Sequence, residues 1–211
     1  MNFLITAATR EELAIAQELA PHRTPDVWTC AITGIGIAAT VYHTLKLLQT
    51  GSYDAAINIG IAGSFTERLL VGSVCCVSKE YFGDCGIQTP QGFHTLFDEH
   101  LVDRNAFPFV DEALHAPTLR QPVFDADIPK AVGVTVHTVS GEQPRIAGLR
   151  ARFSPDIETM ESAAFFYVCL QEKIPFIALR AVSNKVAPRD RSTWDIPLAL
   201  NNLAEALKTM K

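Results

Sequence analysis

Several side chains that can take part in chemistry stand where predicted strands end or a predicted helix begins. Arg180, Ser183 and Asn184 end the last predicted strand. Glu161 opens an otherwise apolar helix, where the helix dipole favours a carboxylate, although an N-terminal charge without a function gives the same pattern. The small residues 60–64 end another strand and would let the backbone approach a flat ligand closely. Because ligands bind at the carboxyl ends of strands in α/β sheets, this combination of carboxylate, amide and guanidinium predicts a site.

The elements that position these side chains alternate along the chain. Short runs rich in β-branched residues predict strands at residues 3–6, 27–33, 55–59, 74–78, 134–139 and 176–182. Helical patterns lie at residues 11–19, 37–48, 144–152, 161–172 and 196–208. This order is typical of an α/β fold, and we expect a single domain over residues 1–211. The segment 83–130 lacks a clear period and is expected to be a long excursion whose loops cover or extend a site. Its proline- and phenylalanine-rich part, residues 82–109, is our candidate for a lid and a partner contact.

Composition and charge exclude several classes of protein. With 48% apolar and 19% charged residues, the 211-residue chain is not disordered, and its net charge of −5 without a basic tract argues against nucleic-acid binding. The five cysteines form no CxxC pair, which favours a reducing cytoplasm over a disulfide framework or a zinc site. No HExxH or GxSxG motif is present. Residues 27–45 lack charge, but glycine and threonine interrupt them, so we expect no membrane span. The N-terminus has no signal-peptide pattern.

A glycine-rich turn offers a dinucleotide-binding alternative. Residues 34–39 fit GxGxxA between a strand and a helix, and Asp54 follows at a suitable distance. However, a ribose-binding acid belongs at the end of the second strand, whereas Asp54 precedes its strand. We therefore interpret the segment as a tight turn that faces a small ligand.

Four short blocks carry a family resemblance that covers nearly the whole chain. They are TAATREE at residues 6–12, NIGIAG at 58–63, MESAA at 160–164 and RAVSN at 180–184. With these blocks in this order, the sequence resembles the purine nucleoside phosphorylase and methylthioadenosine nucleosidase superfamily. Residues 62–65, 160–167, 183–184, 188–191 and 194–199 resemble the futalosine hydrolases within it. The resemblance implies a three-layer sandwich in which helices flank a mixed central sheet.

The resemblance also implies an activity and roles for individual residues. Phosphorylases of the superfamily hold phosphate with arginines in glycine-rich contexts, but Arg10 stands beside Glu11 here, which favours hydrolysis. Cleavage of an N-ribosyl bond passes through an oxocarbenium-like sugar. By resemblance, Glu12 is the general base for water, with Arg180 assisting in positioning. Glu161 would accept the ribose hydroxyls, with Met160 against the sugar. We expect no metal or organic cofactor.

The leaving base and the 5′ substituent are assigned to further residues. The purine would lie between Ala62-Gly63 and Val139-Ser140, with Ser183 and Asn184 at its edge. Adenine-specific nucleosidases carry Asp where Asn184 stands, and an amide that donates to nitrogen-7 or a 6-oxo group favours hypoxanthine, although a flipped amide would accept instead. Trp194 would line the 5′ pocket, and Arg189 or Arg191 would pair with the carboxylate of futalosine, unless both are solvated or pair with Asp190 and Asp195.

The resemblance therefore implies release of hypoxanthine from futalosine in the alternative pathway of menaquinone biosynthesis. The alternatives are a methylthioadenosine or adenosylhomocysteine nucleosidase and a nucleoside-binding protein without turnover. We expect a nucleoside ligand, no nucleic-acid or membrane partner, and a homodimer or higher homo-oligomer, as in relatives.

Overall fold

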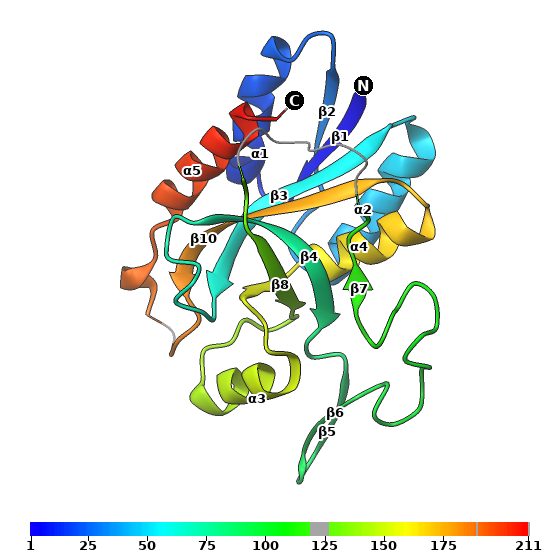
Figure 1. Ribbon diagram of the computed structural model, residues 1–211, viewed down its shortest axis with the longest axis vertical. Coiled ribbons are helices and arrows are strands. Elements are labelled where there is room, and N and C mark those ends of the chain that lie inside the picture. Colours follow the sequence, from blue (N-terminus) through cyan, green and yellow to red (C-terminus); the bar gives the residue numbers. More distant parts are fainter. Residues whose placement is uncertain (119–126, 189, 211) are drawn as a thin grey trace.

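The computed structural model describes residues 1–118, 127–188 and 190–210, and its centre is an eight-stranded mixed sheet (Figure 1). Along the path of the sheet the strand order is β10-β4-β8-β9-β3-β1-β2, with β7 paired to β4. The strands of this path are β1 (Asn2–Ala7), β2 (Val27–Ile32), β3 (Ala55–Ser64), β4 (Val74–Phe82), β8 (Lys130–Thr135), β9 (Ile157–Thr159) and β10 (Phe176–Lys185).

The sheet closes on itself around β3. Strand β3 pairs in parallel with β1 and β10, and it also pairs antiparallel with the short strand β9. Since β10, β4, β8 and β9 are joined in turn, the path returns to β3 and forms a ring of five strands. As a result, Gly63 of β3 has a paired residue on each side, Asn184 on β10 and Glu158 on β9.

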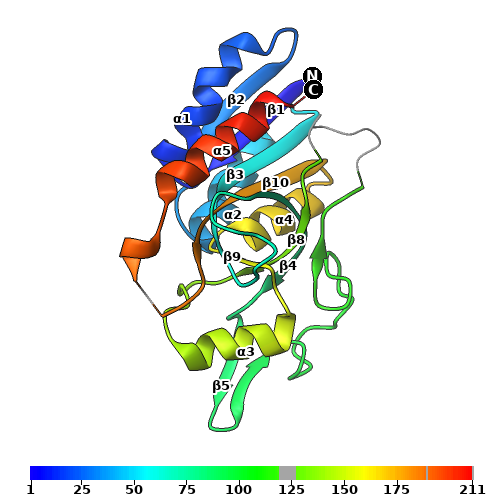
Figure 2. The same cartoon turned by 60° about the vertical axis from the view of Figure 1, so that its left-hand side comes forward.

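Two pairs of helices cover the two faces of the sheet, as Figures 1 and 2 show. One pair is α1 (Arg10–Leu19) and α5 (Ile196–Lys208), which pack against β1, β3 and β10. The other is α2 (Ile37–Thr50) and α4 (Ser162–Gln171), which contact each other. Helix α4 is apolar on all sides because it lies in the core, where seven of its ten residues are buried. The expected three-layer arrangement around a mixed sheet is confirmed.

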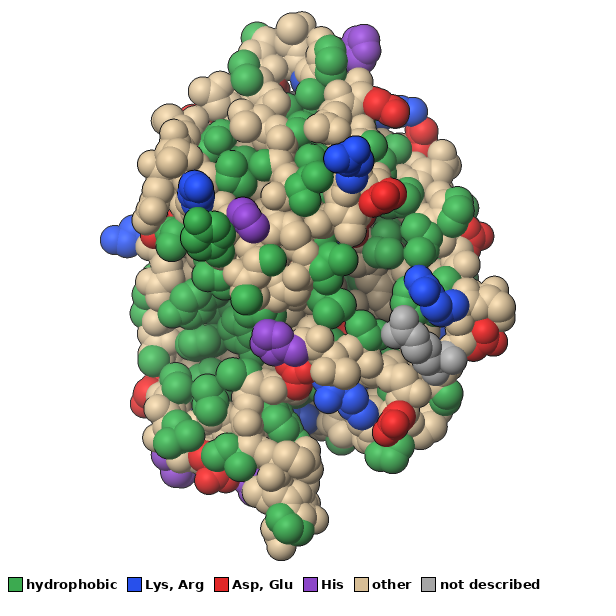
Figure 3. Space-filling model, turned by 180° about the vertical axis from the view of Figure 1, so that it is seen from behind, with side chains coloured by type: hydrophobic (Ala, Val, Ile, Leu, Met, Phe, Trp, Pro, Cys, Tyr) green, Lys and Arg blue, Asp and Glu red, His purple; other side chains and the backbone are tan. Residues whose placement is uncertain are grey.

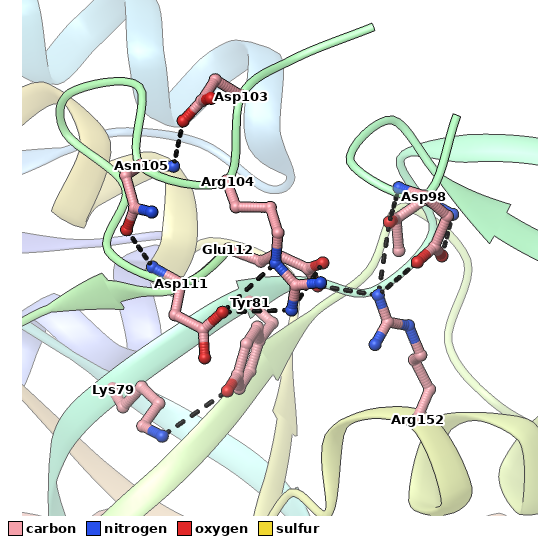
Figure 4. A network of polar contacts seen from close by, with 10 residues as sticks. Lys79, Tyr81, Asp98, Asp103, Arg104, Asn105, Asp111, Glu112 and Arg152 are labelled. Atoms are coloured by element: carbon pink, nitrogen blue, oxygen red, sulfur yellow. Dashed lines mark hydrogen bonds and ion pairs between the residues drawn. The ribbon is translucent and has the colours of Figure 1, made fainter. Parts of the chain in front are cut away.

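Helix α3 (Gln143–Phe153) and the hairpin at residues 86–95 of the excursion lie beyond one end of the sheet (Figure 1), and ion pairs join α3 to the excursion (Figure 4). Arg152 of α3 contacts the carboxylates of Asp98 and Glu112 at 2.9 and 2.7 Å, and Arg104 contacts Glu112 at 3.2 Å. The excursion contains the hairpin of β5 (Gly86–Thr89) and β6 (Gly92–Thr95), followed by β7 (Leu114–His115). None of its described residues lines the cavity considered below, and the role of residues 82–109 as a lid stays a prediction.

The boundaries of several elements differ from the sequence prediction. All five predicted helices are present, with 3₁₀ turns added at Ala20–His22 and Arg191–Thr193. Strand β3 continues five residues beyond its predicted end at Ile59, and β10 continues three beyond Val182, because these small or polar residues pair with each other. The strand predicted at 134–139 overlaps β8 only at residues 134–135, because β8 runs from Lys130 to Thr135. Within the described ranges, no helix is long and apolar enough to cross a membrane.

Candidate active site

A cavity of about 380 Å³ lies at the carboxyl ends of β3, β9 and β10 and beside the first turn of α1. Most residues that the sequence nominated line it, although they come from distant parts of the chain. They are Glu12, Ala62, Gly63, Val139, Met160, Glu161, Ser183, Asn184, Arg191 and Trp194. The extensions of β3 and β10 past their apolar runs therefore form one wall of this cavity.

Glu12 is held at the cavity wall by the start of α1. Thr9 is the N-cap residue, and the two side chains form a capping box in which each accepts a hydrogen bond from the other's backbone N–H. Glu12 Oε2 accepts from the Thr9 N–H (3.0 Å) and hydroxyl (2.9 Å), and Oε1 accepts from the Ile61 N–H (3.1 Å). A Cβ on Gly60 would lie 2.9 Å from Oε1, so the glycine allows this close approach. Glu12 is consequently fixed in one orientation.

Glu161 also lines the cavity and is the N-cap residue of α4. Its Oε1 accepts a hydrogen bond from the Gly36 N–H at 2.9 Å. Burial raises the pKa of the Glu161 carboxyl, and the negative charge of Glu12 raises it further, while the Gly36 bond and Arg180 oppose this. The Gly34-Ile35-Gly36 turn is tight because both glycines have positive φ (84° and 87°). This turn faces the cavity through Ile35, in agreement with our interpretation of residues 34–39.

Arg180 lies beneath the cavity and does not line it. It is 1% exposed, and its guanidinium donates to the Asn58 carbonyl and the Asn58 side-chain oxygen. Burial lowers its pKa, and the carboxylates of Glu161, Glu12 and Glu80 counteract this. Arg180 is therefore placed to act on the carboxylates through charge, and its role in positioning stays a prediction.

Asn184 has a defined amide orientation. Its Oδ1 accepts from the Ser183 hydroxyl (2.8 Å), and its Nδ2 donates to the Lys185 carbonyl (3.0 Å). An amide nitrogen carries two hydrogens, so one N–H of Asn184 stays available to a ligand. The flipped amide would place Oδ1 against the Lys185 carbonyl oxygen and lose that hydrogen bond.

Of the remaining predicted site residues, Ser140 does not line the cavity, Arg189 is outside the described residues, and Arg191 lines the cavity with Trp194. Ser140 is buried next to the cavity, where its N–H donates to Glu158 Oε1 at 2.9 Å. Arg189 lies outside the described residues. The guanidinium carbon of Arg191 lies 5.9 Å from the centre of the Trp194 ring, a cation–π distance, and both side chains line the cavity.

The structure adds cavity residues that the sequence did not indicate. Glu158 and Thr159 belong to β9, which has three residues and is too short to show a periodic pattern. Thr9 lines the cavity too, and the spacing Thr9-x-x-Glu12 is a capping-box signature that identifies it from sequence. Asp54 is distant from this site, because its Oδ2 accepts from the Asn2 N–H at the other end of β3. No cluster of three or more potential metal ligands occurs within residues 1–118, 127–188 and 190–210.

Comparison with known proteins places this fold and site in a family. The sequence profile of the phosphorylase superfamily matches residues 24–211. The chain belongs to this superfamily. A futalosine hydrolase of Streptomyces coelicolor is 31% identical over 192 residues, which cover 88% of this chain and 79% of that protein. A 5′-methylthioadenosine/S-adenosylhomocysteine nucleosidase of Anoxybacillus flavithermus is 29% identical over 203 residues, covering 87% and 85%.

Solved structures of superfamily members share the fold. The native structure of futalosine hydrolase from Helicobacter pylori strain 26695 superimposes with a TM-score of 0.79 and covers 100% of this chain and 97% of that one. At 16% identity, this similarity shows the fold alone. The predicted resemblance to the superfamily and to futalosine hydrolases is confirmed.

Proposed function

We propose that the protein hydrolyses the N-ribosyl bond of futalosine, releases hypoxanthine and dehypoxanthine futalosine, and serves menaquinone biosynthesis. The observation that carries the proposal is the presence of two carboxylates and a fixed amide donor in one cavity. Glu12 and Glu161 both line the cavity, and Asn184 lines it from the end of β10.

The two carboxylates suit a reaction whose transition state is a cationic sugar. Glu12 is oriented by three donors and takes the proton of the attacking water as general base. Glu161 has one oxygen bound to the Gly36 N–H, which leaves the other to accept from the ribose hydroxyls. Met160 packs against the sugar, and the negative charges favour the oxocarbenium-like transition state over the neutral substrate.

The orientation of Asn184 supports hypoxanthine as the purine that leaves. Its available N–H donates to nitrogen-7 or oxygen-6 of hypoxanthine, which are both acceptors. A 6-amino group is a donor and would face this N–H without a hydrogen bond. The purine stacks between the Ala62-Gly63 backbone and the Val139-Ser140 segment.

The 5′ substituent of futalosine is assigned to the end of the cavity near α5. Trp194 lines its apolar part, and Arg191 binds the carboxylate of the carboxyphenyl group. Arg189 is the other candidate for this ion pair, on sequence grounds.

We further propose that the protein is a homodimer or larger homo-oligomer in a reducing cytoplasm. Apolar side chains gather on one side of the face in Figure 3, and large exposed hydrophobic residues include Tyr42 (61%) and Phe107 (65%). Ile35 lines the cavity and is 63% exposed, so a second chain would bury it. The five cysteines are free, as expected in a reducing compartment.

The test is a chromatographic assay of base release from futalosine, 6-amino-6-deoxyfutalosine, methylthioadenosine and inosine, each with and without phosphate. We expect hypoxanthine from futalosine at a rate that phosphate does not change. Adenine release from methylthioadenosine would instead support a salvage nucleosidase. Binding of nucleosides without release of base would support a binding protein.

A further inference from the structure

Glu158 is a buried carboxylate that faces the cavity from β9 and has no part in the mechanism above. It is 5% exposed and pairs with Gly63, which pairs on its other side with Asn184. Residues directly opposite in neighbouring strands point to the same face of a sheet. Glu158 and Asn184 therefore flank Gly63 on one face, and both line the cavity.

The two oxygens of Glu158 differ in their hydrogen bonding. Oε1 accepts from the Ser140 N–H at 2.9 Å, whereas Oε2 is buried without a partner among the described residues. The hydroxyl of Ser140, 4% exposed, makes no hydrogen bond of standard geometry there, but it lies close enough to the carboxylate to lower the pKa of Glu158, which burial raises. A buried polar atom without a hydrogen bond is costly and rare, and here it stands in a ligand cavity. The unpartnered oxygen therefore points to a ligand that donates a hydrogen bond.

We propose that Glu158 determines the choice of base by accepting the N1–H of a 6-oxopurine, beside Asn184 as donor to nitrogen-7 or oxygen-6. The proposal rests on the proposed function, because that function places the purine against Gly63. Hypoxanthine presents acceptors at nitrogen-7 and oxygen-6 followed by a donor at nitrogen-1. The donor of Asn184 and the acceptor of Glu158 match this order across Gly63.

Adenine presents the opposite pattern at two of these three positions. Its 6-amino group is a donor and its nitrogen-1 is an acceptor, so nitrogen-1 would face the carboxylate oxygen without a hydrogen bond. The Ser140 N–H, a backbone donor beside this carboxylate, is already bound to Glu158 Oε1. A site that hydrogen-bonds one base strongly rejects the other, because its buried polar groups are then left unpaired.

Glu158→Gln tests the proposal, since glutamine keeps the shape of the side chain. Its oxygen still accepts from the Ser140 N–H, and its NH₂ group then faces nitrogen-1, which replaces an acceptor by a donor. The matched control is Glu142→Gln, at an exposed position that makes no side-chain capping bond at the start of α3. Calorimetry with the free bases hypoxanthine, 1-methylhypoxanthine and adenine measures recognition separately from turnover.

We expect Glu158→Gln to weaken hypoxanthine binding at least about tenfold, the usual loss of a hydrogen bond to a charged group. Adenine binding should be unchanged or tighter, and Glu142→Gln should behave as wild type. Wild type should bind 1-methylhypoxanthine, which lacks the N1–H, at least about tenfold more weakly than hypoxanthine. Equal binding of hypoxanthine by Glu158→Gln and wild type, or of the two hypoxanthines by wild type, would overturn the proposal. A wild-type protein that discriminates these bases but releases none from futalosine would refute the proposed function alone.

Discussion

Replacing Gly60 by alanine tests whether strand β3 sets the position of the general base. A Cβ at residue 60 would lie 2.9 Å from Glu12 Oε1 and 3.8 Å from Arg180 Cζ. Non-bonded heavy atoms prefer about 3.5 Å or more, so Glu12 Oε1 must withdraw by about 0.6 Å. A displacement of 1 Å at an active site can cost about 10²-fold in rate, and we therefore expect Gly60→Ala to lower kcat/KM roughly tenfold.

The same substitution should leave stability nearly unchanged. Gly60 lies within β3 and has no positive φ, so its backbone accepts alanine without strain. The loss of freedom in the unfolded chain stabilises such variants by about 0.4 to 1 kcal/mol, which offsets part of the new contact. Gly148→Ala is the matched control, because Gly148 lies in α3 with no atom within 4 Å of the added Cβ. This control should gain about 0.5 to 1 kcal/mol and keep full activity.

Rates of base release and thermal unfolding of the two variants test whether Gly60 sets the position of Glu12. The reasoning holds if Gly60→Ala loses activity at an unchanged Tm while Gly148→Ala keeps its rate. Wild-type kcat/KM in Gly60→Ala would refute it. A fall in the Tm of Gly60→Ala of many degrees would also refute it, because the cost would then lie in packing.

Three further predictions concern charged side chains. Glu12→Gln should lower kcat by about 10²-fold or more and still bind hypoxanthine. Single-turnover assays measure the rate, and calorimetry measures the binding. Arg191→Ala should raise KM for futalosine about tenfold but not KM for inosine, since only futalosine has the carboxylate; equal increases would contradict the ion pair. If Arg189 is the partner instead, Arg189→Ala will show this difference. Burial raises the pKa of Glu80 from its usual 4.5 to about 8. The folded state therefore resists ionisation of Glu80. This resistance does not change the free energy of unfolding below pH 4.5, and it lowers that free energy progressively as the pH rises from 4.5 to about 8. The Tm of Glu80→Gln relative to wild type should rise from pH 5 to 8, and a constant difference would exclude this cause.

The layers of the fold were predictable from local patterns, but the closure of the sheet was not. The five helices and the six main strands have clear apolar periods, and the capping box at Thr9 and Glu12 is readable in the sequence. Strand β9 has three residues and exists because it pairs with both β3 and β8. No local signal encodes such long-range pairing.

The contrast between local patterns and long-range pairing also explains why the sequence predicted Glu161 and Asn184 as site residues but not Glu158. Glu161 and Asn184 stand at the ends of patterned elements, so their convergence follows from sheet geometry. Glu158 became visible only when β9 paired with Gly63, because its significance depends on a neighbour almost 100 positions earlier in the chain. The position of Arg180 below the cavity was also not predictable from the sequence. The sequence places Arg180 in a strand, but it does not show that Asn58 holds the guanidinium there.

The charges around Arg180 explain how two carboxylates can stand so close to one sugar. The buried guanidinium lies near Glu12, Glu161 and Glu80, and three ionised carboxyls would leave an excess of two negative charges in the interior. Because burial raises the pKa of Glu80 to about 8, its neutral form prevails at pH 7. With Glu80 neutral, the positive charge of Arg180 acts on Glu12 and Glu161, the two carboxyls that line the cavity. Negative charge stabilises the positive charge that develops on the sugar, so a neutral Glu80 leaves Glu12 and Glu161 as the carboxyls that match the site to its transition state.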